Sequence, residues 1–237
     1  MMLRCVDAET CGFPPDDGQI VEVGWTDIYP KGDGWVVSEP SAMLINPERA
    51  IPAVSSAIHH IVDEDVKDAP LLIDAIAASD LVRDDVFAFV AHRATFERAV
   101  LPLGDVRWIC SWKISVTLAP NAPSHSNQAL RYFLKLNLDR EKASPPHRAG
   151  PDSYVTAHLI ARALAKMTPE QMIEVTAAPL LLPKLHFGKH AGEPCASIPA
   201  DYWEWILKNV IDDEDVQFTA KTYLADRRAA QRSRSPV

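Results

Sequence analysis

The stretch Leu3-Arg4-Cys5-Val6-Asp7-Ala8-Glu9 decides the fold, because an apolar run ends there in two acids placed two residues apart. It predicts a short buried strand that carries Asp7 and Glu9 at its carboxyl end. The two side chains share one face, since successive strand residues point to opposite faces. Neighbouring carboxylates repel each other unless a positive charge, most often a divalent cation, lies between them. The stretch therefore predicts a cation site.

The composition is that of a soluble globular protein, with 237 residues, 47% hydrophobic and 24% charged. This length allows one large domain, or one domain with a small appendage. A net charge of −8 argues against non-specific electrostatic binding to nucleic acid, but not against an enzyme that binds phosphate through metal ions.

The cysteine spacing and the apolar runs predict the compartment. The four cysteines follow no metal-binding or disulfide spacing, which favours reduced thiols. No apolar run reaches the length of a membrane span, and the first residues lack a signal-peptide pattern. We therefore expect a cytoplasmic protein without a membrane partner.

The order of elements along the chain predicts a mixed α/β sheet. Residues 19–29 and 35–45 are predicted strands that form an antiparallel meander, with Pro40 breaking the second. Further strands are predicted at 86–91 and 106–110, among helices at 55–61, 71–81, 95–101, 113–118, 127–134 and 153–166. Asp152 is expected to cap the last of these helices, and Thr168-Pro169-Glu170-Gln171 to cap a further helix. Strands first, then alternating strands and helices, are typical of a mixed sheet.

Three more residues fit a metal-dependent reaction. Glu97 lies within a predicted helix, and His147 precedes Asp152 by five residues. A loop histidine followed by an acid at a helix start can aim both side chains at one site. Clustered carboxylates suit Mg²⁺ or Mn²⁺, and two such ions stabilise an in-line phosphoryl displacement. A nearby histidine can deprotonate the attacking water.

The order of these motifs resembles the DEDDh (DnaQ-like) family of 3′→5′ exonucleases. The motifs are Asp7-x-Glu9, Ala91-His92-Arg93-Ala94-Thr95-Phe96-Glu97 and His147-x4-Asp152. Two stretches, Ala57-Ile58-His59-His60-Ile61 and Ser126-Asn127-Gln128-Ala129-Leu130, are also similar to parts of that family. The resemblance covers residues 1–177 and implies an RNase H-like mixed five-stranded sheet flanked by helices.

The resemblance also implies a role for each motif residue. Asp7, Glu9 and Asp152 would bind the first of two Mg²⁺ or Mn²⁺ ions, and Asp7 would also hold the second. His147 would be the general base. The terminal nucleotide would contact Thr10, Ile58 and His59.

Two positions depart from the family pattern, which usually reads His-Asn-Ala-x-Phe-Asp. Arg93 stands in place of the asparagine and Glu97 in place of the final aspartate. The extra methylene of Glu97 adds roughly 1.5 Å of reach. The site can accommodate this extra length if Glu97 acts through a metal-bound water. If Glu97 binds the metal ion directly, the extra length would lower activity. Arg93 can contact substrate phosphate, pair with Glu97, or point to solvent.

We therefore expect an enzyme that releases nucleoside monophosphates from DNA, as a single strand or at 3′ ends, in repair. One alternative is an RNase T-like or oligoribonuclease-like enzyme acting on RNA, since the motifs are shared. Another is a catalytically weakened nucleic-acid-binding protein, with Arg93 and Glu97 as signs of decay. The oligomeric state stays open, a homodimer included.

The remainder of the chain predicts a small second module at residues 178–226. It follows a proline-bounded leucine run at 179–183, a predicted linker, and carries His186-Phe187-Gly188-Lys189-x-x-Gly192. Its expected core is formed by Trp203, Trp205, Ile206 and Leu207. Residues 227–237 are rich in arginine and serine and predict a basic, disordered tail.

Overall fold

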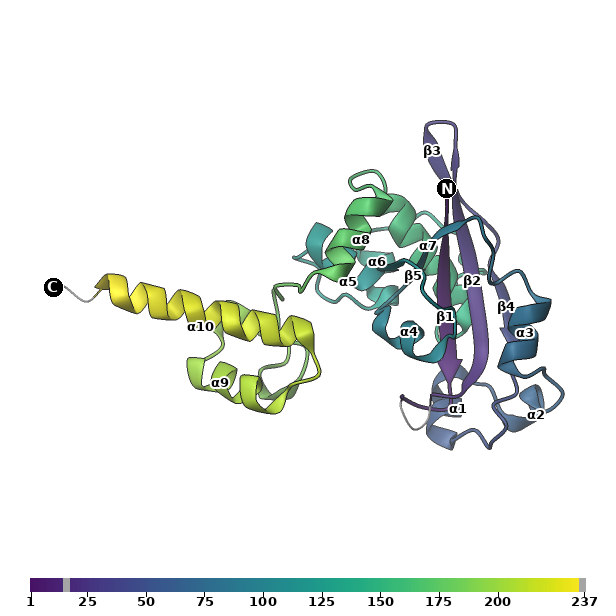
Figure 1. The fold of residues 1–237 in the computed structure, drawn as a ribbon, viewed down its shortest axis with the longest axis horizontal. Coiled ribbons are helices and arrows are strands. Elements are labelled where there is room, and N and C mark those ends of the chain that lie inside the picture. Colours follow the sequence, from purple (N-terminus) through teal and green to yellow (C-terminus); the bar gives the residue numbers. More distant parts are fainter. Residues whose placement is uncertain (15–17, 235–237) are drawn as a thin grey trace. The chain divides into compact units, whose positions relative to one another are not determined.

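A computed structural model describes residues 1–14 and 18–234, with side chains described up to residue 229 (Figure 1). The chain forms two compact units, one spanning Met1–Thr176 and the other beginning at Ala177. The sequence predicts the boundary at residue 177. Each unit has its own core and is described separately.

A mixed sheet forms the centre of the first unit (Figure 1). Strand β1 (Met2–Thr10) pairs antiparallel with β2 (Ile20–Lys31) and parallel with β5 (Val86–Ala91), which pairs parallel with β6 (Trp108–Cys110). The predicted third strand is split before Ser41 into β3 (Gly34–Val37) and β4 (Ser41–Leu44), which both pair with β2. Pro40 accounts for the break, because proline has no N–H to donate. The predicted mixed sheet is confirmed.

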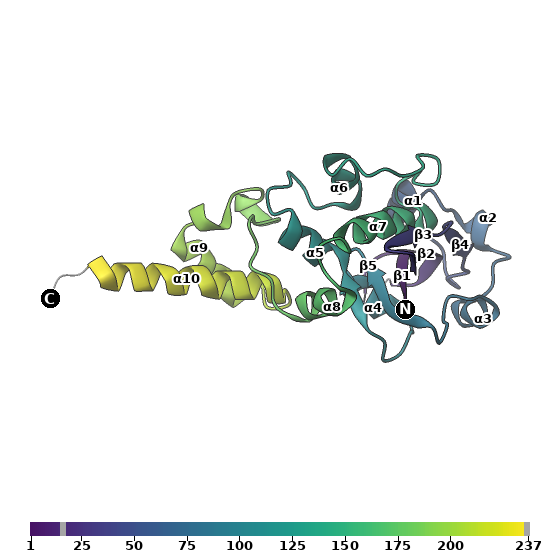
Figure 2. The same cartoon turned by 90° about the horizontal axis from the view of Figure 1, so that it is seen from above.

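Helices cover both faces of this sheet (Figure 2). The helices of the first unit are α1 (Ala53–His59), α2 (Asp63–Val66), α3 (Leu72–Ala78), α4 (Thr95–Val100), α5 (Ser111–Leu118), α6 (Asn127–Phe133), α7 (Ala149–Ala163) and α8 (Pro169–Ala177). On one face of β1, Leu3 and Cys5 pack with Ala157 of α7. On the other, Val6 and Ala8 share a cluster with Ala75 of α3. Because strand side chains alternate, Asp7 and Glu9 continue the Leu3–Cys5 face toward α7.

Helix α7 begins earlier than the sequence predicts. Its first residue is Ala149, so Asp152 lies within the first turn and is not the cap. Pro151 is tolerated there because a first-turn N–H has no partner inside the helix. The Ala149 N–H donates to Glu22 Oε2 at 2.8 Å, so a carboxylate on β2 satisfies the helix end. A cap supplied by a distant strand explains why local sequence misplaced the start.

Gly24 of β2 allows the start of α7 to approach the sheet. A Cβ at Gly24 would lie well under 3.0 Å from the backbone of Ala149 and Gly150. Gly24 pairs with Asp7 in the β1–β2 register. The contact therefore brings the first turn of α7 next to the strand position that carries Asp7.

The second unit is built from α9 (Ala200–Asn209) and α10 (Glu214–Arg234), which pack together, and the short 3₁₀ helices Gly188–His190 and Cys195–Ser197. Trp203 and Ile206 are fully buried, and the Trp203 ring stacks on Tyr223 at 5.9 Å. Trp205 was expected in this core but is 47% exposed, and its ring stacks on Tyr202. Because Trp205 follows Trp203 by two residues on a helix, the two side chains point in different directions.

Two segments at the ends of this unit differ from prediction. The leucine run at 179–183 is no free linker, because Leu182 is buried and its N–H donates to Thr219 Oγ1 at 2.9 Å. The tail expected to be disordered from Arg227 is helical in α10 as far as Arg234, and residues 235–237 lie outside the described residues. Arg227 donates to the carbonyls of Ala196 and Ile198, which fastens this part of the helix.

Candidate active site

Strand β1 and helix α7 together bring three of the predicted residues into contact range. Glu9, His147 and Asp152 each offer a ligand atom, and these atoms all lie within 4.8 Å of one another. Asp7 precedes Glu9 by two residues on the same face of β1 and is close enough to Asp152 for that acid to raise its pKa. The motifs that are far apart in sequence therefore meet at one edge of the sheet.

The acids at this edge are held in an environment that disfavours their charged forms. Burial, followed by the charges of Asp152, Glu97, Glu9 and Glu22, raises the pKa of Asp7 well above its usual value. Burial and the same kind of repulsion raise the pKa of Glu9 to about 8. Acids crowded in this way are relieved by bound protons or by cations. The cluster therefore suits a cation at neutral pH.

Glu97 joins the acid cluster from the helix that follows the neighbouring strand β5. It lies in α4, which follows the carboxyl end of β5, and β5 runs parallel to β1, so both strand ends meet at the same edge. Glu97 is 3% exposed, and its Oε2 has no hydrogen-bond partner within the described part of the chain. Burial, with Glu9 nearby, raises its pKa to about 8.

The residues at this edge fit a divalent ion. A buried carboxylate oxygen without a partner costs free energy unless a cation or a metal-bound ligand satisfies it. The surrounding donors are carboxylate oxygens with one imidazole, which suits Mg²⁺ or Mn²⁺ better than a soft metal. Asp7, Glu9, Asp152 and Glu97 are the residues able to hold such ions.

A tight turn aims His147 at Asp152. His147 has a φ of +59°, a conformation that a residue with a side chain adopts only where its surroundings enforce it. The backbone N–H of His147 donates to Asp152 Oδ2 at 2.9 Å. Gln128 Nε2, from the first turn of α6, donates to Asp152 Oδ1 at 2.9 Å. Gln128 lies in a stretch that the sequence had marked as family-like, but nothing in that stretch indicated its contact with Asp152.

Glu22 and Arg148 are further functional candidates that the sequence reasoning missed. Glu22 is 3% exposed and accepts hydrogen bonds from Arg148 Nε at 2.9 Å and from Arg148 Nη2. It pairs with Glu9 in the β1–β2 register, which places it beside the acid cluster. A signal was present: a lone acid inside the apolar run Ile20-Val21-Glu22-Val23 is buried only when it is paired.

Thr10, Ile58 and His59 lie near the end of β1. Helix α1 is tied to the chain after β1 because Ser55 Oγ donates to the Cys11 carbonyl at 2.5 Å. Ile58 is exposed on this helix, whereas His59 is buried. Burial lowers the pKa of His59, while the Thr10 backbone opposes that effect, so the His59 ring lies close to Thr10. Helix α1 therefore lies next to the end of β1 that carries the acids, with Ile58 exposed.

Arg93 occupies a position that the sequence left open. It has a φ of +72° at the turn after β5, and its guanidinium lies 4.4 Å from the centre of the Trp112 ring. That distance is typical of a cation–π contact. The preceding residue, His92, contacts Ser111 Oγ and the His125 carbonyl, each at 2.8 Å. Arg93 thus stacks on an aromatic ring at the same sheet edge.

The fold and the acid cluster define a class of protein, and comparison with known families names it. The Exonuclease family (RNase_T) matches residues 5–160, and the chain belongs to this family. It is an exonuclease with an RNase H-like fold, which confirms the predicted DEDDh, DnaQ-like class.

The chain is also similar to individual proteins of known class. The chain is 34% identical to exodeoxyribonuclease 10 of Escherichia coli strain K12 over 232 residues, which covers 94% of this chain and 99% of the relative. A solved structure of exonuclease X in complex with 5′ overhanging duplex DNA has a TM-score of 0.63 and 36% identity, and covers 74% of this chain and 99% of that one. The DNA polymerase III subunit epsilon of Treponema pallidum is 26% identical over 170 residues, covering 67% of this chain and 74% of the relative.

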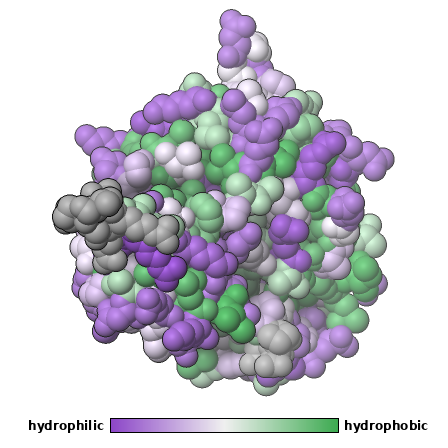
Figure 3. All heavy atoms as spheres, turned by 60° about the vertical axis from the view of Figure 1, so that its left-hand side comes forward, coloured by the Kyte–Doolittle hydropathy of each residue, from purple (hydrophilic) through white to green (hydrophobic). Residues whose placement is uncertain are grey.

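None of the helices within residues 1–14 and 18–234 has the length and apolar character needed to cross a membrane. Hydrophilic and apolar side chains are interspersed over the face in Figure 3.

Proposed function

We propose that this protein is a metal-dependent exonuclease that removes nucleoside monophosphates from the 3′ ends of DNA. The observation that carries the proposal is the meeting of Glu9, His147 and Asp152 within 4.8 Å, beside Asp7 and Glu97. The named relatives are an exodeoxyribonuclease and a DNA-bound exonuclease, which supports DNA as the substrate.

Each residue of the site has a part in this proposed reaction. Two Mg²⁺ or Mn²⁺ ions, when bound, would neutralise the scissile phosphate and the leaving 3′ oxygen. Asp7, Glu9 and Asp152 would hold them, with Glu97 completing the charge. His147 accepts the proton of the attacking water, a role for which histidine is the commonest residue. Thr10, Ile58 and His59 orient the terminal nucleotide, and Arg93 contacts a substrate phosphate.

The intact site argues against a weakened binding protein. The buried, unpaired oxygen of Glu97 and the crowded acids of β1 have a cost that a protein without chemistry would have no reason to bear. A role in DNA repair, in the cytoplasm, is part of the proposal. All four cysteines carry buried thiols, which suits a reducing compartment.

The test is release of mononucleotides from a 3′-labelled single-stranded DNA and a matched RNA, with Mg²⁺, Mn²⁺ or a chelator. We expect metal-dependent release from DNA that is lost in Asp7→Asn and falls by at least about 100-fold in His147→Gln. Faster release from RNA would instead support the exoribonuclease alternative. No release from either substrate, or full activity in Asp7→Asn, would overturn the proposal.

The position of Glu97 is tested separately. If Glu97 acts from its buried place, Glu97→Ala loses most activity, whereas Glu97→Asp, which restores the family residue, keeps it. Parent-like rates in both variants would remove Glu97 from the site. Arg93→Ala is expected to raise KM for DNA and to leave kcat unchanged, because Arg93 would bind substrate rather than assist the chemistry.

A further inference from the structure

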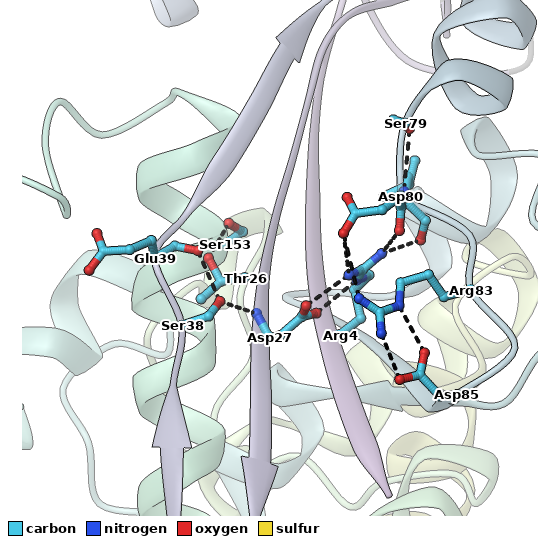
Figure 4. A network of polar contacts seen from close by, with 11 residues as sticks. Arg4, Thr26, Asp27, Ser38, Glu39, Ser79, Asp80, Arg83, Asp85 and Ser153 are labelled. Carbon is cyan, nitrogen blue, oxygen red and sulfur yellow. Dashed lines mark hydrogen bonds and ion pairs between the residues drawn. The ribbon is translucent and has the colours of Figure 1, made fainter.

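Two arginine–carboxylate pairs of the same type are attached to strand β2. Near its beginning, Glu22 accepts from Arg148 Nε at 2.9 Å, from Arg148 Nη2, and from the Ala149 N–H at 2.8 Å. Further along, Asp27 accepts from Arg4 Nε at 2.7 Å and from Arg4 Nη2 at 2.8 Å (Figure 4). Both pairs are bidentate, the strongest form of such a contact.

The two pairs fasten different parts of the chain. Arg4 also donates to the carbonyls of Asp80 and Leu81, and so holds the loop before β5 (Figure 4). That loop carries none of the residues of the candidate active site. Arg148, in contrast, directly follows His147, and Ala149 is the first residue of the helix that carries Asp152. Glu22 therefore holds the one segment that presents both of these residues.

Glu22 differs from the other acids of the cluster. It is paired with Glu9 across the β1–β2 register and is as deeply buried as Glu97. Its two oxygens are already engaged by Arg148 and Ala149, whereas Glu97 has an oxygen without a partner in the described residues. An acid whose oxygens are both engaged by a guanidinium is matched in charge and is not available to a metal ion.

We propose that Glu22 and Arg148 form a positioning pair that sets His147 and Asp152 against Asp7 and Glu9. Metal affinity and turnover then depend on this pair, although neither residue touches substrate or metal. The inference rests on the proposed function. Its physical basis is that residues outside the ligand set fix the orientation of the ligands, and their loss typically costs about 10- to 100-fold in metal affinity or activity.

The experiment uses the intact chain and three measurements: Mn²⁺ affinity by titration calorimetry, kcat and KM on single-stranded DNA, and the melting temperature without metal. The variants are Glu22→Gln, Arg148→Met and the two combined. Asp27→Asn is the matched control, because it breaks a bidentate pair on the same strand away from the site. Arg148→Lys keeps the positive charge but cannot donate two parallel hydrogen bonds to Glu22. It tests the pair if Glu22→Gln does not fold.

We expect Glu22→Gln and Arg148→Met each to weaken Mn²⁺ binding and to lower kcat by about 10- to 100-fold, with KM unchanged. The double variant is expected to be no worse than the singles, since either change removes the same contact. Arg148→Lys should fall between them and the parent. Asp27→Asn should lower the melting temperature but keep the Mn²⁺ affinity and kcat of the parent.

Two results would overturn the pair as a positioning device. One is parent-like Mn²⁺ affinity and kcat in Glu22→Gln or Arg148→Met. The other is an equal loss in Asp27→Asn, which would indicate general loosening of the fold. A parent protein that neither binds Mn²⁺ nor releases nucleotides would overturn the proposed function itself, and with it this inference. If the parent protein binds Mn²⁺ and releases nucleotides, a parent-like Glu22→Gln or Arg148→Met variant refutes the positioning pair and leaves the proposed function standing.

Discussion

Replacing Gly24 by alanine tests whether the close packing of α7 on β2 sets the site. The new Cβ would lie well under 3.0 Å from the Ala149 and Gly150 backbone, while ordinary contact begins at 3.4 Å. The first turn of α7 must therefore retreat by on the order of 1 Å, and no side-chain rotation relieves the clash. Overpacking of this kind costs roughly 1–3 kcal/mol in the free energy of unfolding. A displacement of about 1 Å in a catalytic group can lower the rate about 100-fold.

The assay compares the melting temperature and the rate of nucleotide release in Gly24→Ala with those in Gly34→Ala. Gly34 is the matched control, because the nearest atom to a Cβ there is the Lys31 carbonyl oxygen at 4.0 Å. We expect Gly24→Ala to melt several degrees lower and to lose most of its rate, and Gly34→Ala to resemble the parent. A Gly24→Ala protein with the rate and melting temperature of the parent would refute the reasoning.

Three further predictions concern pH, Gln128 and the second unit. The pKa of Glu97 is raised from 4.5 to about 8, so the folded state binds more protons than the unfolded state within that window, and stability falls as pH rises through it. Metal-free protein should thus melt at progressively lower temperature from about pH 5 to about pH 8, and Mg²⁺ should reverse the trend; a flat profile would contradict this. Gln128→Leu removes the 2.9 Å bond to Asp152 Oδ1 and should lower kcat by about 10-fold with little change in melting temperature, whereas unaltered kinetics would exclude a role for Gln128. Trp203→Ala removes a fully buried ring and should destabilise the second unit by about 3–5 kcal/mol, seen as rapid proteolysis after residue 177; resistance equal to that of the parent would count against it.

The sequence predicted those parts of the molecule whose signals are local. The apolar run before Asp7, the β-rich run that became β5 and the capping pattern at Thr168 each depend on a few adjacent residues. The Thr168 N–H donates to Gln171 Oε1 at 2.9 Å, and the Gln171 N–H to Thr168 Oγ1 at 3.3 Å, as a capping box requires. Such signals need no knowledge of the rest of the fold.

The features that sequence missed depend on contacts between distant residues. The start of α7 was misplaced because its cap is Glu22, and Glu22 lies 127 residues from Ala149 in the chain. Gln128 and Arg148 have ordinary helix and loop surroundings, and only the folded chain brings them to Asp152 and Glu22. The helical extent of α10 was missed for a related reason, since Arg227 is fastened by the Ala196 and Ile198 carbonyls. In each case a polar partner from another element overrides the local preference.

The cap that β2 supplies to α7 has a consequence for how the protein comes into being. Asp7 and Glu9 emerge well before α7 during synthesis, but the first turn of the helix that faces them lacks its partner until Ala149 has reached Glu22. Long-range contacts of this kind form late, because a long loop must be ordered first. A nascent chain that stops before His147 therefore carries Asp7 and Glu9 but neither His147 nor Asp152. Exonuclease activity is thus acquired in a single late step, once the first unit has been completed.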